Sequence, residues 1–435
     1  MTATAIILAA GLGTRMKSAL PKTLHKIAGR PMLHHLLDSC SQVFNRIVVV
    51  VGPEMDQVAK ACAPYPVVVQ HDRLGTAHAA LQAEAEFGEG DVAVLYADNP
   101  LISPDTLRRL LASRGDAGLA LLAMRLQDPA RYGRVLVEDG SVTRIVEYAD
   151  ATPAERAITL CNAGVMSAPA ADMRTWLHAV GNANSKGEYY LTDLVEIARA
   201  TGKRVAAVEA PFEELRGVNS RAELADAEAA VQQSLRRTAM DAGVTLIAPE
   251  TVFFSYDTQI AADVTVEPNV VFAPGVTIST GATIRAFSHL EGCTVGPDAI
   301  IGPYARLRPG TIVGRAAHVG NFVELKATTL GDGAKANHLS YLGDSSIGAR
   351  TNVGAGTITC NYDGFAKHRT AIGIDVFIGS NSILVAPVTV GDNALIAAGS
   401  VITHDVAPDA MAFGRASQVD KPGRGAVFKA KRSKI

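Results

Sequence analysis

Two glycines and several cationic side chains follow the first apolar run of the chain. The run Ala5–Leu8 has the composition of a buried strand, and Gly11, Gly13, Arg15 and Lys22 follow it in the string LAAGLGTRMKSALPK. Glycine lets the backbone turn tightly and approach a ligand without an intervening Cβ. Loop amides beside a helix N-terminus donate to anions, and nearby cations favour a polyphosphate. The segment therefore predicts a nucleotide-binding loop.

This loop differs from two common phosphate-binding motifs. A dinucleotide fingerprint requires a third small residue where Met16 stands, and the spacing of a P-loop is absent. A lone GxG after a strand is more often a tight turn, but Thr14, Arg15 and the Pro21–Lys22 pair favour a phosphate site. The whole string resembles the signature of the sugar-nucleotide pyrophosphorylases, in which it spans the nucleoside triphosphate.

An acidic residue that could bind a metal ion follows another apolar run. Asp98 comes directly after Val92–Tyr96. Transfer of a nucleotidyl group to a sugar 1-phosphate is an in-line attack on the α-phosphate, and it depends on cation and metal clamps rather than on covalent chemistry by the protein. A carboxylate oxygen is a suitable ligand for the Mg²⁺ of such a site. We expect Asp98 to face the phosphate loop.

A second set of reactive residues lies in the last third of the chain. His338 occurs near cationic and polar residues such as Arg308 and Lys326. Single histidines on repetitive folds are more often structural. A histidine with a near-neutral pKa can nevertheless act as a general base, and nearby cationic side chains suit an anionic substrate. His338 is therefore a candidate general base.

Length and composition limit the class of protein. A chain of 435 residues predicts two or three domains. A net charge of −2 gives no basic field for nucleic acid, and no apolar stretch reaches the roughly 18–20 residues of a membrane helix. Five cysteines without metal-ligand spacing fit reduced thiols in a cytoplasmic protein.

Three regions are expected to position these residues. Residues 1–217 alternate Val-, Ile- and Leu-rich runs with amphipathic stretches, which predicts an α/β domain of Rossmann-like type with a mostly parallel sheet. Ligands of such sheets bind at the carboxyl ends of the strands. Residues 218–244 contain a long stretch without Gly or Pro and predict a linker helix. Residues 245–435 have a different spacing of apolar residues and end in a basic tail after Asp420.

The third region has a period of six. Apolar residues recur at this spacing from Ile260 to Leu290, resume one position out of phase at Val295, and return at Ile372 after further shifts. One hexad supplies a short strand and a corner, so three hexads complete one turn of a parallel β-helix. The repeats resemble those of the hexapeptide-repeat acyltransferases, which implies left-handed coils and a homotrimer. The segment Cys360–Arg369 breaks the period and predicts a loop, a frequent place for function.

Together, the motifs resemble those of the bifunctional N-acetylglucosamine-1-phosphate uridylyltransferases/glucosamine-1-phosphate acetyltransferases over nearly the whole chain. The resemblance implies acetyl transfer from acetyl-CoA to glucosamine 1-phosphate. UMP transfer from UTP to N-acetylglucosamine 1-phosphate follows and gives UDP-N-acetylglucosamine and pyrophosphate. The resemblance also implies that Asp98 and Asn219 bind Mg²⁺ and that Arg15 and Lys22 contact the phosphates. The implied nucleotide and sugar contacts are Leu8, Ala9, Ala10, Gly11, Lys22, Gln70, Gly75, Thr76, Tyr96, Ala97, Asp98, Gly133, Glu147, Asn162 and Asn219.

The same resemblance assigns the acetyl-transfer residues, in a site that combines neighbouring subunits. His338 is the implied base, and Ser380 or a backbone N–H such as that of Ala355 the implied oxyanion donor. The implied contacts to glucosamine 1-phosphate are Arg308, Lys326, Tyr341, Asn352 and Lys367. The implied contacts to acetyl-CoA are Ala355, Asn361, Tyr362, Ser380, Ala398 and Arg415.

Four positions depart from the family pattern: Ala97, Asn99, Ala163 and Ala327. Two alternative functions follow. In the first, the chain is a pyrophosphorylase whose β-helix serves only assembly or regulation. In the second, the N-terminal domain is a degenerate nucleotide-binding module. Release of a free thiol from acetyl-CoA, and release of pyrophosphate from UTP, distinguish these alternatives from the two-site enzyme.

Overall fold

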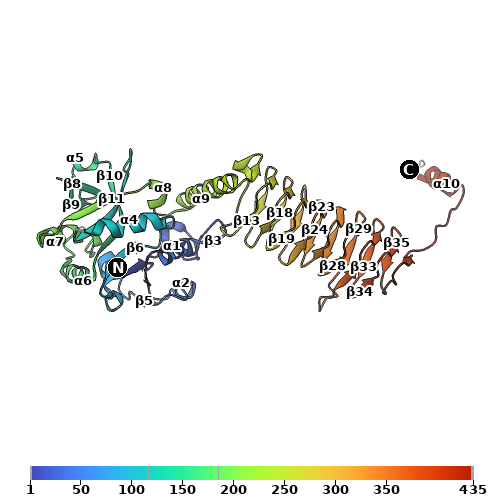
Figure 1. The fold of residues 1–435 in the computed structure, drawn as a ribbon, viewed down its shortest axis with the longest axis horizontal. Helices are drawn as coiled ribbons and strands as arrows, with labels where there is room; N and C mark the ends of the chain where they lie inside the picture. Colours follow the sequence, from blue (N-terminus) through green and yellow to red (C-terminus); the bar gives the residue numbers. More distant parts are fainter. Residues whose placement is uncertain (1, 116, 185, 433–435) are drawn as a thin grey trace. The chain divides into compact units, whose positions relative to one another are not determined.

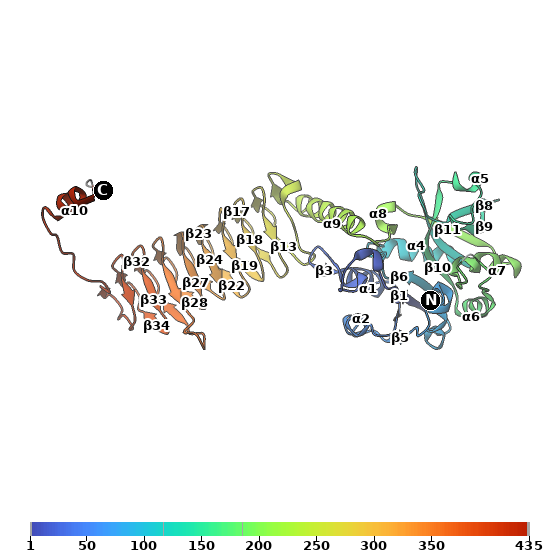
Figure 2. The same cartoon turned by 180° about the vertical axis from the view of Figure 1, so that it is seen from behind.

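The computed structural model describes residues 2–115, 117–184 and 186–432. It divides into two compact units, Met1–Gln232 and Gln233–Ile435 (Figures 1 and 2). The division falls inside helix α9 (Arg221–Asp241), within the segment expected to link two domains. The finer three-part division stays a prediction. In the described ranges, no helix is long and apolar enough to cross a membrane.

The first unit is built on a nine-stranded sheet. Its main path runs β11-β7-β10-β6-β1-β4-β5, and the hairpin of β8 (Arg134–Glu138) and β9 (Ser141–Val146) joins it at β10. All neighbours on the main path are parallel except those of β10. This confirms the mostly parallel sheet. The main-path strands are β1 (Ala3–Leu8), β4 (Arg46–Val51), β5 (Val67–Val69), β6 (Asp91–Tyr96), β7 (Leu119–Arg125), β10 (Leu160–Pro169) and β11 (Val205–Glu209).

Helices cover both faces of this sheet. Alternate side chains of β1 enter two different cores, because successive residues of a strand point to opposite faces. Ile7 packs in the core that includes residues of α1 (Met32–Ser41) and α4 (Pro104–Arg114). Ile6 packs in the core that includes residues of α3, α6 and α7. The remaining helix bounds are α2 (Asp56–Ala61), α3 (Thr76–Leu81), α5 (Pro153–Arg156), α6 (Ala170–Ala179), α7 (Leu194–Ala200) and α8 (Phe212–Leu215).

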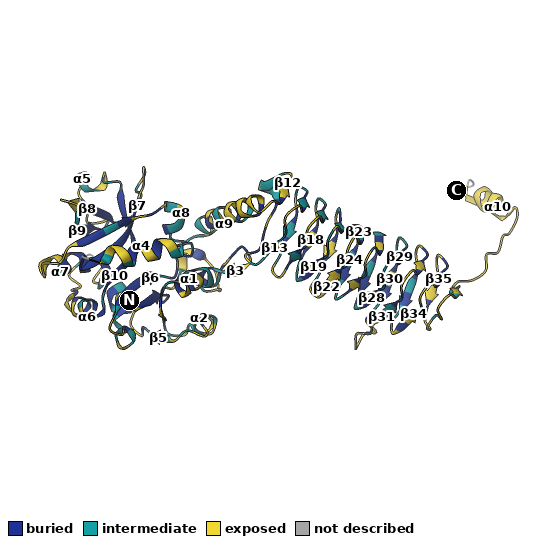
Figure 3. Cartoon of the chain, in the orientation of Figure 1, coloured by how far each residue is buried: buried dark blue, intermediate teal, exposed yellow. Residues whose placement is uncertain are grey.

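The second unit is a parallel β-helix. Its strands have two to four residues and form three sheets of ten, eight and eight strands, in which each strand pairs with one on the next coil. Thr265 of β14 (Thr265–Val266) pairs with Thr283 of β17 (Thr283–Ile284), which is three hexads further along the chain. The inward apolar residues form one continuous core, drawn as buried in Figure 3. The predicted β-helix is confirmed.

The shift in the hexad phase has a structural cause. Thr277 of β16 (Thr277–Ile278) pairs with Thr294 of β19 (Cys293–Val295), so this coil is one residue shorter than the coil before it. The missing residue belongs to the corner at Gly292, whose φ is 51°. The sheets continue in register, because the shortening is confined to a corner.

One corner of the β-helix joins the ten-stranded sheet to the eight-stranded sheet that contains β24 (Glu324–Lys326). Four consecutive coils place a large apolar residue there with φ between 49° and 61°, namely Phe287, Tyr304, Phe322 and Leu339. The first three rings stack, with centroid separations of 4.9 and 5.2 Å, and all four side chains are exposed. We call these four residues the apolar corner. In the next three coils the corner residues are Gly356, Asn381 and Gly399.

The chain after the last coil has little contact with the β-helix core. Helix α10 (Arg424–Arg432) has no buried residue and is drawn as exposed in Figure 3. It carries several of the cations of the expected basic tail, whereas Lys434 lies outside the described residues.

Candidate active sites

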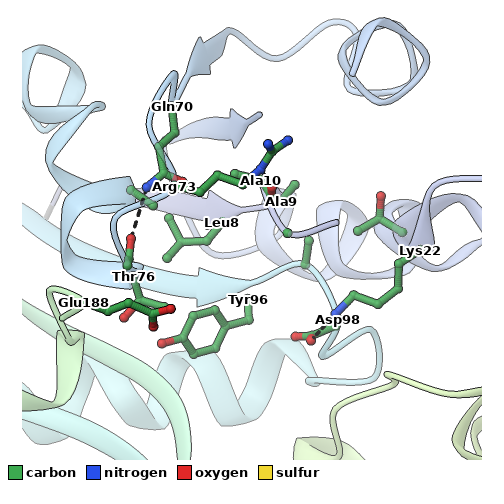
Figure 4. A pocket seen from close by; sticks show the side chains of 15 residues that line it. Leu8, Ala9, Ala10, Lys22, Gln70, Arg73, Thr76, Tyr96, Asp98 and Glu188 are labelled. Carbon is green, nitrogen blue, oxygen red and sulfur yellow. Dashed lines mark hydrogen bonds and ion pairs between the residues drawn. The ribbon is translucent and has the colours of Figure 1, made fainter. Parts of the chain in front are cut away.

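The first candidate site lies at the carboxyl edge of the N-terminal sheet. Leu8 of β1 pairs with Tyr96 of β6, and the Ala97 N–H donates to the Leu8 carbonyl at 3.0 Å. The phosphate loop and Asp98 therefore leave the sheet side by side. A cavity of about 230 Å³ opens between them (Figure 4). It is lined by Leu8, Ala9, Ala10, Gly11, Lys22, Thr23, Gln70, Arg73, Gly75, Thr76, Ala79, Tyr96, Ala97, Asp98 and Glu188.

The two glycines of the loop serve different purposes. Gly13 has a φ of 61°, and a Cβ there would lie 2.6 Å from Lys22 Cβ, so a larger residue would displace Lys22. A Cβ on Gly11, in contrast, would meet no protein atom within 4 Å. Gly11 therefore leaves open space beside the cavity that a ligand can enter. Arg15 lies on a short 3-10 turn (Thr14–Met16), is exposed, and is not among the residues that line the cavity.

Three side chains converge at one end of the cavity. Lys22 Nζ donates to Asp98 Oδ2 at 2.6 Å and to Asn219 Oδ1 at 2.9 Å. Asn219 comes close because the Val218 N–H donates to the Asp98 carbonyl at 2.8 Å. The structure thus brings together residues that are far apart in the sequence, with two oxygens aimed at one cationic group.

This donor set fits a magnesium ion. One carboxylate and one amide oxygen are hard ligands, and Mg²⁺ is usually held by one or two protein oxygens together with substrate phosphates. Within the described part of the chain, no group of three or more His, Cys, Asp and Glu residues forms a separate metal cage. At this cavity, the Asp98 carboxylate and the Asn219 amide oxygen are the donors that fit the ion.

The other end of the cavity contains Gln70, Gly75 and Thr76, which belong to the implied nucleotide contacts. Gln70 is buried, and its Nε2 donates to the Gly75 carbonyl at 3.1 Å. Gly75 has a φ of 121°, and a Cβ there would lie 2.6 Å from the backbone N of Tyr189. The segment around Tyr189 crosses this loop closely, and it places Glu188 at the cavity wall. Arg73 and Glu188 were not predicted, and the sequence offers no signal for them, because ordinary loop composition surrounds both.

A larger cavity of about 780 Å³ adjoins the first and shares Thr76, Tyr96, Asp98 and Glu188 with it. It is lined by the residues expected to contact the sugar, Gly133, Glu147 and Asn162, and by the expected magnesium ligand Asn219. The structure adds lining residues that were not predicted, among them Arg131, Tyr132, Lys186, Tyr190 and Thr192.

Burial raises the pKa of several ionisable groups that line this larger cavity, among them Glu147 and Tyr96. It raises the pKa of the Glu147 carboxyl, while the charge of Lys186 lowers it. It also raises the pKa of the Tyr96 hydroxyl, which therefore stays protonated and able to donate. The cavity wall thus offers both a carboxylate acceptor and a hydroxyl donor to a polar ligand such as a sugar.

The departures from the family pattern are accommodated. Ala97 is buried in the wall of the first cavity, and Ala163 lines the second. Asn99 is buried, and its Nδ2 donates to the Leu215 carbonyl at 2.6 Å, which ties the end of β6 to α8. Ala327 occupies a corner with a φ of 46°.

The second candidate site contains two rows of residues on the β-helix. The first row precedes the corner described above, one residue per coil: Asn321, His338, Ala355, Ser380 and Ala398. Backbone hydrogen bonds keep this order: the Gly356 N–H donates to the His338 carbonyl, and the Asn381 N–H to the Ala355 carbonyl. We call this set the corner row. Arg415 lies next to its end, since a Cβ on Gly399 would be 3.8 Å from Arg415 Cδ. Asn352 lies on β29 (Asn352–Val353), in the same sheet.

The second row follows the corner, on the adjoining sheet. Arg308, Lys326 of β24, Tyr341 of β27 (Tyr341–Gly343) and Asn361 belong to successive coils. Arg308 Nη1 donates to Glu324 Oε1 at 2.9 Å, and Lys326 Nζ donates to Asp344 Oδ2 at 3.2 Å. Asn361 Nδ2 also donates to Asp344. We call this set the cationic row. Glu324 and Asp344 hold its cations in place, and neither residue was predicted from the sequence.

The loop after β30 (Ile358–Cys360) adds a further cation to this row. Lys326 lowers the pKa of the Lys367 ammonium, and Arg308 adds a smaller effect in the same direction, because these like charges lie close together. Asp344 offsets part of this repulsion, and the three cations together form a suitable site for a phosphate. Tyr362 is at the base of the loop, where it bridges to Lys367, and its side chain is exposed.

Comparison with known proteins gives the same two-part picture. Residues 5–171 match the MobA-like NTP transferase domain, residues 292–327 the bacterial transferase hexapeptide (six repeats), and residues 369–404 the hexapeptide repeat of succinyl-transferase. These repeats identify the parallel β-helix as the left-handed type.

Curated relatives match the chain over nearly its whole length. The bifunctional protein GlmU of Gluconacetobacter diazotrophicus is 68% identical over 434 residues, which cover 98% of this chain and 94% of the relative. That of Acidiphilium cryptum is 64% identical and covers 99% of both chains. That of Gluconobacter oxydans is 66% identical and covers 98% of this chain and 96% of the relative. At this identity and coverage, the chain belongs to the bifunctional GlmU family.

Proposed function

We propose that each structural unit carries one of the two activities of the family. The chain is a bifunctional acetyltransferase and uridylyltransferase that produces UDP-N-acetylglucosamine. The observation that carries the assignment is the presence of two separate constellations in one chain. The first is the Lys22–Asp98–Asn219 cluster beside a cavity, and the second is the pair of rows on the β-helix.

In the N-terminal unit, UTP occupies the smaller cavity and N-acetylglucosamine 1-phosphate the larger one. Gln70 and Gly75 face the base, and Glu147 and Asn162 bind the sugar. A phosphate oxygen of the sugar 1-phosphate bonds to the α-phosphorus of UTP as the bond to pyrophosphate breaks. Lys22 neutralises charge at the phosphates, and Arg15 enters from the exposed turn.

Mg²⁺ completes this proposal. When bound, the ion neutralises phosphate charge and fixes the geometry of the displacement. Asp98 and Asn219 would hold it, which would free Lys22 to contact the phosphates. The support for this exchange is that the Lys22 ammonium already occupies the convergence point of the two oxygens.

In the β-helix unit, glucosamine 1-phosphate binds at the cations of the cationic row, and acetyl-CoA binds beside Ala355, Ser380 and Ala398 of the corner row. Arg308, Lys326 and Lys367 surround the phosphate, while Tyr341 and Asn352 orient the sugar. Asn361, Tyr362 and Arg415 contact the coenzyme. The amine nitrogen bonds to the thioester carbon, and its proton passes to the imidazole ring of His338. The C–S bond then breaks, with Ser380 or the Ala355 N–H donating to the oxyanion, and CoA leaves as a thiol after protonation.

A homotrimer is part of this proposal. The corner row and the cationic row lie on two sheets that meet at the corner, so one chain presents them in different directions. A neighbouring copy packed along the apolar corner brings a corner row opposite a cationic row. Four exposed apolar side chains on consecutive coils support this contact.

Two substitutions test whether each unit carries one of the two activities. We expect His338→Ala to reduce thiol release from acetyl-CoA at least about 100-fold, since it removes the proton acceptor. Pyrophosphate release from UTP is expected to stay unchanged. Asp98→Asn should have the opposite pattern, because it removes a charged ligand of the metal. Thiol and pyrophosphate are measured separately, each with its own sugar phosphate.

Two matched variants serve as controls. His289→Ala removes an exposed histidine of β18 (His289–Leu290), and Asp105→Asn removes an exposed carboxylate of α4. Both should leave the two activities within about twofold. Loss of both activities in either test variant would contradict separate sites, and full acetyl transfer by His338→Ala would remove His338 from its role as base.

A further inference from the structure

We propose that Asn321 is a positioning residue for His338: its side-chain oxygen holds the ring with a hydrogen on Nδ1 and leaves Nε2 free to accept the proton of the amine. This inference rests on the proposed role of His338 in acetyl transfer. It adds a residue that lies one coil away from His338 and for which no function was predicted from the sequence.

The backbone brings the two side chains together. Asn321 ends β23 (His318–Asn321), His338 ends β26 (Lys335–His338), and the two residues are directly paired in the parallel register. The Leu339 N–H donates to the Asn321 carbonyl at 3.0 Å. This register depends on main-chain atoms and on inward residues such as Val319 and Ala336. The Asn321 side chain is therefore not required to hold the coils together.

The side chains make one direct contact. His338 Nδ1 lies 2.8 Å from Asn321 Oδ1. An amide oxygen can only accept, so this contact requires a hydrogen on Nδ1. In a neutral imidazole the other nitrogen then has the lone pair. Within the part of the chain that the structure describes, the protein supplies no hydrogen-bond partner for His338 Nε2, so this nitrogen is open to a substrate.

The choice of an amide rather than a carboxylate at this position has a chemical consequence. A carboxylate beside Nδ1 would stabilise the imidazolium after the proton arrives and would make the ring hold that proton more strongly. A neutral amide fixes the same orientation and tautomer without adding charge. His338 can then accept the proton of the amine and release it again in each turnover.

The surroundings of the pair are cationic. A cavity of about 300 Å³ beside it is lined by Arg285, Tyr304 and His318 as the other ionisable residues. Burial lowers the pKa of His318, and the charges of Arg285, Lys335 and His338 lower it further. None of the residues that line this cavity is a carboxylate. A carboxylate placed at position 321 would therefore be the first acidic group in the lining.

Two variants of the full-length enzyme test the inference through the pH profile of acetyl transfer. Asn321→Asp keeps the acceptor but adds a charge, and we expect it to move the midpoint of the acidic limb of kcat/KM upward by about one pH unit or more. Asn321→Ala removes the acceptor, and we expect kcat to fall about 10–100-fold, the size of the loss when a partner that orients a metal-bound histidine is removed. Its KM values for acetyl-CoA and glucosamine 1-phosphate should change less than about twofold.

A spectroscopic measurement reports the tautomer directly. In ¹⁵N-labelled enzyme, the His338 ring should show the pattern of a hydrogen on Nδ1, and Asn321→Ala should give mixed tautomers. A wild-type ring with its hydrogen on Nε2 would mean that the amide donates rather than accepts, and it would overturn the inference. An Asn321→Asp profile with an unmoved midpoint would overturn it as well.

Controls separate this inference from the proposal on which it depends. Asn393→Asp adds the same charge at an exposed corner with a φ of 56°. Asp375 and Asp409 adopt the same conformation, so the backbone accepts aspartate there. This variant should not move the pH profile of acetyl transfer. Unchanged uridylyl transfer and thermal midpoint show that each variant is folded. If His338→Ala retains acetyl transfer, the proposed base is wrong. If it loses acetyl transfer but Asn321→Ala does not, only the positioning role is wrong.

Discussion

The Glu147 carboxyl is proposed to bind the sugar, yet its buried environment disfavours the ionised form. Burial raises its pKa, so ionisation is harder in the folded protein than in the unfolded chain. Below the unfolded pKa, the group is neutral in both states and has no effect on stability. As the pH rises through the raised pKa of the folded state, the ionised carboxylate becomes a destabilising group, and the penalty is complete above that pKa.

We therefore predict that Glu147→Gln stabilises the N-terminal unit at pH 7–8 and loses this advantage near pH 4. The same change should raise the KM for N-acetylglucosamine 1-phosphate about tenfold or more, since a hydrogen bond to a charged group is lost. Thermal unfolding between pH 4 and 8 and steady-state kinetics check the two effects. Glu138→Gln, at an exposed carboxylate of β8, is the control. An equal stability gain at pH 4 would contradict the role of ionisation.

At the scale of elements, the loop between β30 and β31 (Thr370–Ile372) is held by one carboxylate. Asp363 accepts from the N–H groups of Phe365 and Ala366 and from His368 Nε2. These bonds, led by that of Ala366, hold the pKa of Asp363 well below its usual value. A depressed carboxyl pKa stabilises the loop above the unfolded pKa, and this stabilisation is lost as the pH falls through the lower folded value.

We predict that Asp363→Ala loosens this loop and weakens only acetyl transfer. Lys367 is next to Lys326 through the folded loop, so the KM for glucosamine 1-phosphate should rise several-fold while kcat changes less. Initial rates over a range of sugar phosphate concentrations, with uridylyl transfer measured in parallel, check this effect. Asp332→Ala, at an exposed aspartate outside this loop, serves as the control. An unchanged KM in Asp363→Ala would mean that Lys367 does not contact the phosphate.

The β-helix and the parallel sheet could be predicted from the sequence, whereas several side-chain contacts between strands could not. The period of six gave the β-helix, because every coil buries one residue per hexad, and the alternation of apolar runs gave the parallel sheet. Asp98 and Lys22 could be placed at one sheet edge, because the carboxyl ends of parallel strands meet there. Asn321 and Asp344 could not be recognised, because their partners lie one coil away and no local pattern marks them.

At the scale of the whole molecule, the residues at one β-helix corner change from large and aromatic to small along the coils. Phe287, Tyr304 and Phe322 form an exposed stack at left-handed φ values, which are unfavourable for aromatic residues. Beside Ala355, Ser380 and Ala398, the same corner holds only glycine or asparagine. Large side chains would therefore serve contact with another copy in the earlier coils, and small ones leave room for a coenzyme in the later coils.

This division leads to a prediction about assembly. Aspartate occupies other corners with positive φ, such as Asp298 and Asp344, so Tyr304→Asp and Phe322→Asp fit the backbone but place charge in the apolar corner. We expect the wild-type chain to sediment as a trimer and the double variant as a monomer, because burying two unpaired carboxylates opposes association. Acetyl transfer should fall at least about 100-fold in the monomer, since its two rows no longer meet, while uridylyl transfer stays within about twofold. Ala316→Asp, at an exposed corner with a φ of 51°, adds the same charge elsewhere and should leave the trimer intact. A monomer with full acetyl transfer would show that one chain contains the whole site.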